Sequence, residues 1–323
     1  MPVKRPVRFS IFHPPAGDSP LTAFGLLLCG VIVLALQDAL VKLISTETSF
    51  WQFQTLRSFG NLTFIIGLSV SAGGLRLMVP ANWRPVYLRG LVLAICMFFF
   101  FSGAPFLSVA QMAAGLYTYP LFVSILAGPV LGERVGAWRI AALLVGAGGA
   151  FLMLDPLSSA FSPVQILPII AGFFYACNIL ILRRHCRQES PLALTTAVAT
   201  LFIISGLAGI LFLTINPAAP ASVASMPFVA VGWPELSLLV LVTAFGCSAL
   251  NLSGNICLAR AYQTADSSWL APLEFIYLLF AAVWGRVIFT HWPEPQAIAG
   301  MALIAGAGML TAWREQRRQK QTA

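Results

Sequence analysis

The chain has 323 residues, of which 59% are hydrophobic and only 9% are charged. A soluble domain carries about 25% charged residues and could not hide this much apolar surface at this length, so the composition excludes a soluble globule. The net charge of +8 does not indicate a nucleic-acid binder, because the basic residues lie in short segments between apolar stretches. We therefore expect a protein that lies in the lipid bilayer.

Ten apolar stretches follow one another along the chain, each close to the roughly 20 residues that a helix needs to cross a bilayer. Backbone groups in lipid must be satisfied within the segment, so each stretch is predicted to be a helix. Because many more follow it, the first is expected to be a span and not a cleaved signal peptide. The predicted spans are Leu21–Ile44, Phe50–Ala72, Pro85–Val109, Gln111–Leu131, Ala137–Leu154, Val164–Leu182, Pro191–Ile215, Leu236–Leu258, Ser267–Phe289 and Pro295–Ala312.

The basic residues indicate how these spans are oriented. When the spans alternate in direction, all but three of the 19 lysines and arginines fall in or next to the tails and loops of one side. The exceptions are Lys42, Arg57 and Arg286, which lie within spans. Positive charge collects on the cytoplasmic side, so we expect an inner-membrane protein with both termini in the cytoplasm.

The chain also contains an internal repeat. Ala142–Gly148 in the fifth span matches Ala302–Gly308 in the tenth at five of seven positions, and Pro120 and Pro272 each open a Pro-Leu step in the fourth and ninth spans. Matches five spans apart make the two halves inverted in the membrane, which is typical of transporters. We predict an all-α fold of ten transmembrane helices in two inverted five-helix repeats. The predicted units are residues 21–156 and 157–313, between tails at residues 1–20 and 314–323.

Several of these segments resemble the EamA-type branch of the drug/metabolite transporter superfamily. Asp38–Lys42 ends the first span, Tyr119–Val123 carries the Pro-Leu step, and Leu131–Arg134 is similar to the family's Leu-Gly-Glu pattern. The second half departs from the family at Thr290–Trp292, where a glutamate is usual. The resemblance covers about residues 21 to 313. It implies a transporter, more commonly an exporter, with the fifth and tenth helices at the periphery.

Ionisable side chains inside a bilayer are costly and usually face a partner or a cavity. Asp38 and Arg57 lie at similar depths in successive spans, so we expect them to pair, with Lys42 one turn beyond Asp38. The pair is either an anion-attracting or proton-coupled site, or a structural ion pair beside a snorkelling lysine. Glu274 follows Pro272 by two residues, with no basic residue within a turn. It is a candidate proton-coupling or amine-binding group, or a protonated carboxyl that hydrogen-bonds a neighbouring helix.

Polar and aromatic side chains are also predicted near the midplane of the fourth, sixth, eighth and ninth spans. We consider them candidates for substrate contact. The alternatives are asparagines that only join helices and aromatic rings that form interfacial belts. These candidates are Tyr117, Tyr119, Tyr175, Asn178, Asn251, Asn255 and Tyr277.

Together these features predict a secondary transporter that moves a small organic metabolite across the inner membrane by alternating access. The substrate expected from this lining is amino-acid-like or an amphipathic amine, with export as the direction and protons as a candidate coupling ion. No nucleotide loop, catalytic triad, metal cluster or cofactor motif is present in the sequence, which argues against an enzyme. A membrane-embedded enzyme or a lipid-handling protein is the alternative, and a channel would not need the repeat.

Overall fold

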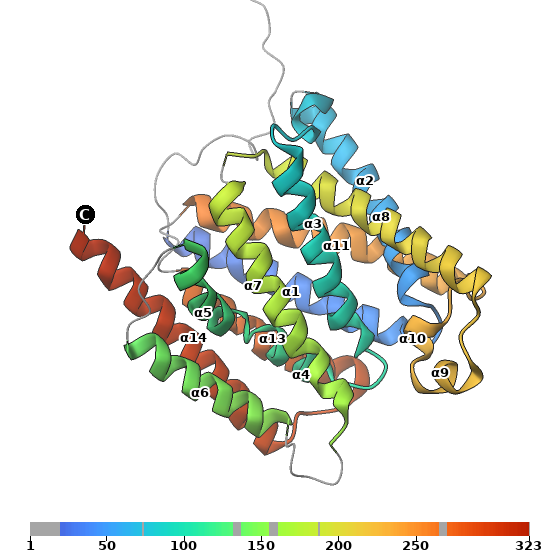
Figure 1. Ribbon diagram of the computed structural model, residues 1–323. Coiled ribbons are helices and arrows are strands. Elements are labelled where there is room, and N and C mark those ends of the chain that lie inside the picture. The colour runs from blue at the N-terminus through green and yellow to red at the C-terminus, as the bar shows by residue number, and fades with distance from the viewer. Residues whose placement is uncertain are drawn as a thin grey trace, which may run out of the picture.

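The computed structural model describes residues 20–72, 74–131, 137–154, 161–186, 188–264 and 270–322. Every regular element in these ranges is helical, which confirms the predicted all-α class (Figure 1). The main helices are α1 (Pro20–Ile44), α2 (Phe50–Ala72), α3 (Trp83–Ser102), α4 (Val109–Leu116), α5 (Tyr119–Leu131), α6 (Ala137–Leu154), α7 (Leu167–His185), α8 (Pro191–Ile215), α11 (Leu238–Thr264), α13 (Ile276–Phe289) and α14 (Pro295–Thr322). The shorter helices are η2 (Leu75–Met78), η3 (Pro163–Ile166), α9 (Pro220–Ser225), α10 (Pro227–Ala230) and η4 (Ala271–Phe275).

Six helical segments in the described part of the chain are long and apolar enough to cross a membrane. They are Leu21–Ile44, Trp83–Ser102, Val109–Leu126, Pro163–His185, Pro191–Ile215 and Leu238–Tyr262. Two shorter apolar segments, Ile140–Met153 and Pro295–Leu310, coincide with the fifth and tenth predicted spans. The protein is therefore a multi-pass membrane protein. The ten-span arrangement stays a prediction, since α2 and the η4–α13 segment are not among these apolar segments.

The last helix is longer than the sequence pattern predicted. α14 continues to Thr322, whereas the predicted span ends at Ala312 and a separate tail was expected from residue 314. Residues 314–322 contain no glycine or proline and are rich in arginine, glutamine, glutamate and lysine, which are strong helix formers. Loss of hydrophobicity ends an apolar span without ending the helix.

Helices of the first half pack against helices of the second half. The most extensive pairs are α1 with α11, α6 with α14, α3 with α7 and α2 with α8. Glycines allow two of these close approaches. A Cβ atom on Gly149 would lie 2.8 Å from the carbonyl oxygen of Gly300, and one on Gly30 would lie 3.0 Å from that of Gly254. Small residues at membrane helix crossings let the backbones meet in this way. α6 and α14 lie side by side at one edge of the bundle, in the peripheral position that the resemblance implies (Figure 1).

The fourth predicted span is divided into two helices. Instead of one helix over Gln111–Leu131, the chain forms α4 and α5 with a break between them. Pro120 has no N–H to donate to the carbonyl four residues earlier, so the helical hydrogen-bond pattern is interrupted at this point. The Thr118 hydroxyl donates to the carbonyl of Gly115 at 2.7 Å and satisfies part of the freed backbone. An apolar stretch of sufficient length therefore does not guarantee one continuous helix.

The ninth predicted span, Ser267–Phe289, is interrupted in a related way. Residues 265–269 lie outside the described part of the chain, and the span continues as η4, which contains Pro272, and then as α13. A proline near the start of a helical segment is tolerated because the first N–H groups of a helix have no partner within it. The two Pro-Leu steps of the repeat thus coincide with the two interrupted spans.

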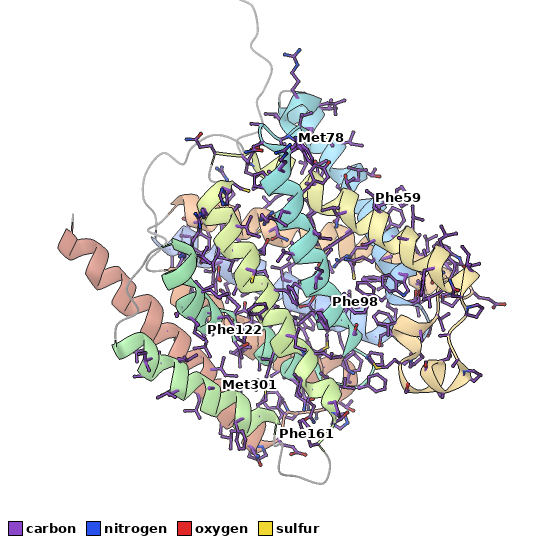
Figure 2. The ribbon with its side chains drawn as sticks, in the orientation of Figure 1. Phe59, Met78, Phe98, Phe122, Phe161 and Met301 are labelled. Carbon is purple, nitrogen blue, oxygen red and sulfur yellow. The ribbon has the colours of Figure 1, made fainter. Side chains whose placement is uncertain are left out.

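Aromatic side chains fill much of the space between α2 and α3 (Figure 2). The ring centre of Phe98 lies 5.4 Å from that of Phe50 and 5.5 Å from that of Trp51. Phe101 is fully buried, so the phenylalanine run of α3 packs helices together. On the outer face of α2, Phe59 is 47% exposed, as suits a surface in contact with lipid.

Candidate functional site

Five of the six tyrosines in the chain gather near the two interrupted spans. Tyr117 stacks on Tyr277, with ring centres 5.0 Å apart and planes inclined by 12°. Tyr119 meets Tyr117 edge-on at 5.9 Å and Tyr175 edge-on at 4.9 Å. The fifth, Tyr262 of α11, joins them through a shared carboxylate. We call these five residues the tyrosine cluster; the first and second halves of the chain both contribute to it.

Glu274 connects three segments of the cluster. The hydroxyl of Tyr262 donates to its Oε1 at 2.6 Å, and the hydroxyl of Tyr119 donates to its Oε2 at 3.4 Å. Glu274 lies in η4, where Pro272 interrupts the regular helix, so the irregular backbone aims the carboxylate at tyrosines of α5 and α11. The structure thus brings Glu274 together with the predicted candidate Tyr119 and with Tyr262, which was not predicted.

Asp38 of α1 lies at another side of the cluster. The hydroxyl of Tyr277 donates to its Oδ2, and the side-chain amide of Gln37 donates to its Oδ1 at 3.0 Å. Because Tyr277 also stacks on Tyr117, Asp38 is linked to the aromatic rings around Glu274. The two carboxylates therefore belong to one site, and each is held by tyrosine hydroxyls.

The direct pair expected between Asp38 and Arg57 is not formed. The two groups are close enough to interact electrostatically, but the guanidinium donates to Oε1 of Gln54 at 2.9 Å and not to the aspartate. The physical reason is that α11 packs against both helices: the Cys247 thiol lies 3.9 Å from the carbonyl oxygen of Gln37, and the Ser248 hydroxyl donates to that of Arg57. Helices that are successive in sequence are here kept apart by a third. The rings around the guanidinium are Phe53, Phe101 and Phe202, at 5.5, 5.6 and 5.8 Å.

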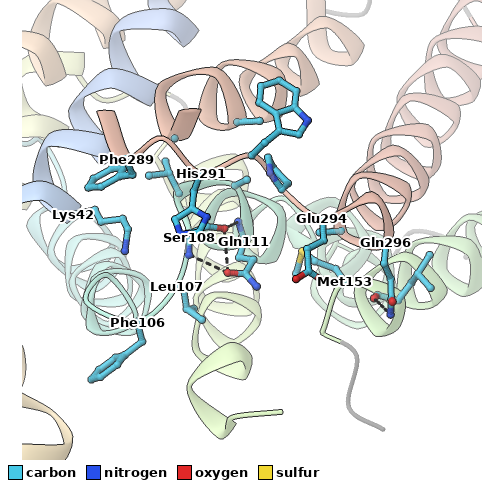
Figure 3. A pocket seen from close by; sticks show the side chains of 18 residues that line it. Lys42, Phe106, Leu107, Ser108, Gln111, Met153, Phe289, His291, Glu294 and Gln296 are labelled. Atoms are coloured by element: carbon cyan, nitrogen blue, oxygen red, sulfur yellow. Dashed lines mark hydrogen bonds between the residues drawn. The ribbon is translucent and has the colours of Figure 1, made fainter. Parts of the chain in front are cut away.

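Lys42 faces a cavity and does not join the carboxylates. This cavity has a volume of about 420 Å³, and its lining includes Gln111, His291 and Glu294 (Figure 3). The ammonium group donates to the carbonyl of Ala104 at 2.8 Å and lies 5.4 Å from the ring centre of a phenylalanine of α13. Lys42 is one helical turn from Asp38, but no residue of the tyrosine cluster lines the cavity.

The first turn of α4 forms one wall of the cavity. Ser108 and Gln111 make a capping box, in which the Gln111 backbone N–H donates to the serine hydroxyl at 3.2 Å and the Ser108 N–H donates to Oε1 of Gln111 at 2.9 Å (Figure 3). Since α4 ends next to Tyr117, this cap fixes the helix that presents the stacked ring.

The predicted asparagines are not gathered into the cluster in the same way. Asn178 is buried on α7, one turn from Tyr175, and its Oδ1 makes no hydrogen bond within the described residues. Asn255 is exposed, and its amide donates to the backbone carbonyl of Asn251 at 2.7 Å. No hydrogen bond joins Asn251 or Asn255 to the tyrosines in the described part of the chain. Glu133, which the resemblance marked, lies outside the described residues.

Tyr262 is the site residue that the sequence pattern missed. The eighth span was predicted to end at Leu258, before Arg260, but α11 continues to Thr264. A signal was present, because Gln111 and Gln263 each lie nine residues before the proline of a Pro-Leu step, and Tyr262 immediately precedes Gln263. The charge of Arg260 marked the limit of the apolar stretch and not the limit of the helix.

Known proteins with similar sequences support a transporter. Residues 21–155 match the EamA-like transporter family. A riboflavin transporter of Rhizobium johnstonii is 27% identical over 279 residues, which cover 86% of this chain and 84% of that protein. An S-adenosylmethionine uptake transporter of Rickettsia prowazekii is 23% identical over 292 residues, covering 90% and 92%. A solved crystal structure, 20% identical with a TM-score of 0.57, covers 89% of this chain and 97% of its own and shares the fold. The match over the first half of the chain and the names of these relatives support an EamA-type transporter of the drug/metabolite transporter superfamily.

Proposed function

We propose that the chain is a secondary transporter that carries a small metabolite through the tyrosine cluster by alternating access. The proposal includes ten spans in two inverted repeats, with both termini on the cytoplasmic side of an inner membrane. It is supported by the packing of first-half helices on second-half helices and by the stacking of Tyr117 on Tyr277 where the two interrupted spans meet. Discontinuous helices around a site between two repeats suit a mechanism that exposes the site to each side in turn.

The observation that carries the substrate class is the position of two carboxylates against aromatic rings. Asp38 and Glu274 supply negative charge, and the tyrosine cluster supplies ring faces and hydroxyls. Carboxylates and ring faces both attract positive charge. We therefore propose an amphipathic cation with a flat or apolar part, in agreement with the amine expected from the sequence.

The two named relatives differ in how well their substrates fit this chemistry. S-adenosylmethionine is a sulfonium cation with an amino group and an aromatic base, whereas riboflavin is a flat ring system without a positive charge. The tyrosine rings suit both, but only the cation uses the two carboxylates. Within the described residues neither carboxylate forms an ion pair, so a cationic substrate has two acceptors to which it can bind.

The direction that we propose is uptake. The sequence resemblance favoured export, but the Rickettsia prowazekii relative is named as an uptake transporter and matches 90% of this chain. This direction is tested by adding labelled substrate to one side of oriented vesicles that contain no unlabelled substrate and measuring how fast the label enters.

Counterflow in proteoliposomes tests the function and the substrate class together. Vesicles loaded with unlabelled S-adenosylmethionine should accumulate the labelled compound faster than empty vesicles, and Tyr117→Ala should abolish the difference. Tyr87→Phe is the matched control, because Tyr87 lies outside the cluster. If the vesicles show counterflow of riboflavin but not of S-adenosylmethionine, the proposed cationic substrate would be wrong and a neutral flat substrate would be favoured. Flux that does not depend on loading would contradict a transporter and favour a channel, and a new chemical product in detergent would favour an embedded enzyme.

A further inference from the structure

Unpartnered polar atoms are concentrated on α1 and α2. Eight buried side-chain nitrogen and oxygen atoms make no hydrogen bond within the described residues, and five of them belong to α1 and α2. Buried polar atoms without a partner are uncommon in proteins and call for an explanation such as bound water or an ion. The five atoms are Oε1 of Gln37, Nε2 of Gln54, Nε of Arg57, Oγ of Ser58 and Oδ1 of Asn61.

Four of these residues form one stripe on α2. Gln54, Arg57, Ser58 and Asn61 are spaced three and four residues apart, so they share a face of the helix. Gln54, Arg57 and Ser58 are 1%, 3% and 0% exposed, which rules out bulk solvent as their partner. From Gln54 to Asn61 the stripe extends about 10 Å along the helix, at 1.5 Å per residue.

Gln37 is connected to this stripe through α11. The Cys247 thiol lies 3.9 Å from the carbonyl oxygen of Gln37 and is close to Asp38 and Arg57. The neighbouring Ser248 hydroxyl donates to the Arg57 carbonyl at 2.7 Å. The backbones of Gln37 and Arg57 therefore contact successive residues of α11, Cys247 and Ser248.

The mixture of donors and acceptors identifies the missing partner. Gln54 and Arg57 have unused donors, Gln37 and Asn61 have unused acceptors, and the Ser58 hydroxyl can act as either. The amide orientations of Gln54 and Gln37 follow from their other hydrogen bonds, to Arg57 and Asp38. An anion would satisfy only the donors and a metal cation only the acceptors, whereas water satisfies both and suits a buried polar site.

We propose that these side chains hold a chain of bound water that connects Asp38 to the middle of α2. This bound water gives Asp38 a route for proton exchange that does not pass through the cavity at Lys42. The role in proton exchange rests on the proposed transport function, whereas the presence of the bound water does not. The ionisable groups that face Asp38 are Arg57 of α2, Cys247 of α11, Tyr277 of α13 and, one turn along α1, Lys42.

Cys247 is a native reporter of this water. Its S–H infrared band should convert to S–D soon after the purified protein is transferred to D₂O, because water next to the thiol supplies deuterium. Cys96 of α3 is the matched control, because it is equally buried and belongs to the same hydrophobic cluster as Cys247. Single Cys247→Ala and Cys96→Ala variants assign the two bands. Exchange at Cys247 that is no faster than exchange at Cys96 would overturn the proposal, whether or not the protein transports.

The stability of a Ser58 variant gives a second, independent measurement. If water satisfies the hydroxyl, Ser58→Ala removes hydrogen bonds and should lower the apparent melting temperature in detergent. If the hydroxyl is dry and unpartnered, the same change removes an unfavourable buried group and should leave the melting temperature unchanged or raise it, which would contradict the proposal. Ser69→Ala is the control on the same helix, because the buried Ser69 hydroxyl is already satisfied by the carbonyl of Ile65 at 2.8 Å.

Discussion

The two carboxylates of the site lie in different electrostatic surroundings. Asp38 has the Arg57 guanidinium within electrostatic range and Lys42 one turn away, whereas Glu274 is contacted only by tyrosine hydroxyls in the described part of the chain. A buried carboxylate without a nearby cation is stabilised by taking up a proton or by binding a positive group. Within the described residues, Asp38 thus has opposite charge supplied by the protein, whereas Glu274 has none.

The largest expected effect comes from removing the titratable group that lacks a cation. Glu274→Gln keeps the size of the side chain and its ability to accept a hydrogen bond from Tyr262, but it cannot exchange a proton. We expect the variant to fold, to lose the acceleration of flux by a pH gradient and to retain some counterflow at equal pH. Flux assays in proteoliposomes with and without a gradient measure both. Unchanged pH dependence would make Glu274 a structural hydrogen-bonding group and would direct attention to Asp38.

The tyrosine hydroxyls around Glu274 should matter for stability. Tyr262→Phe removes the 2.6 Å hydrogen bond and leaves the ring, which should lower the free energy of unfolding by about 1–3 kcal/mol. Tyr119→Phe should cost less, because its hydrogen bond is 3.4 Å long. Denaturant titration in micelles measures these differences, with Tyr87→Phe as the control outside the cluster. Equal losses for all three variants would show that Glu274 does not depend on these hydroxyls.

A double-mutant cycle tests the other carboxylate. Asp38→Asn and Arg57→Gln should couple by no more than about 1–2 kcal/mol, because the groups interact at a distance and not by direct contact. Breaking a direct buried ion pair costs about 3–5 kcal/mol. A coupling energy in that higher range would mean that the two side chains meet directly in the membrane, and the contrast with Glu274 would become greater.

The smallest effect is expected at Asn255. Its side chain is exposed, and within the described residues its amide bonds the carbonyl of Asn251 on the same helix, so Asn255→Leu should leave counterflow close to that of the unaltered protein. Asn178→Leu, by comparison, changes a buried amide one turn from Tyr175 and should reduce it. If Asn255→Leu were the more damaging of the two, the face of α11 that lines the substrate path would have to be assigned again.

Much of the fold follows directly from local sequence. The predicted limits of the second and seventh spans, Phe50–Ala72 and Pro191–Ile215, agree with α2 and α8 to the residue. Ser190 explains the second case, since its hydroxyl accepts the N–H of Leu192 at the start of the helix and Pro191 occupies the first helical position. These helix limits are predictable because the length of the apolar stretch and the capping residues can both be read from the local sequence.

The features that the sequence did not predict depend on which helices are neighbours in the folded protein and on where helices break or continue. The expected contact of Asp38 with Arg57 assumed that spans joined by a short loop are neighbours, yet α11 lies against both. Tyr262 was missed because it lies beyond a charged residue, although a helix can carry a polar side chain inward past the end of its apolar stretch. The break before Tyr119 was missed because average hydrophobicity does not register how one proline affects the preceding turn.

The stacking of Tyr117 on Tyr277 has a consequence for selectivity. The two rings, 5.0 Å apart between centres, already occupy the space in which a flat ligand would find its best aromatic contacts. For a planar ring to enter between them, the tyrosines must separate by roughly a further 3.5 Å, the thickness of one aromatic layer. A flat ligand that enters between the rings must therefore replace the stacking contact of the two tyrosines with stacking contacts of its own.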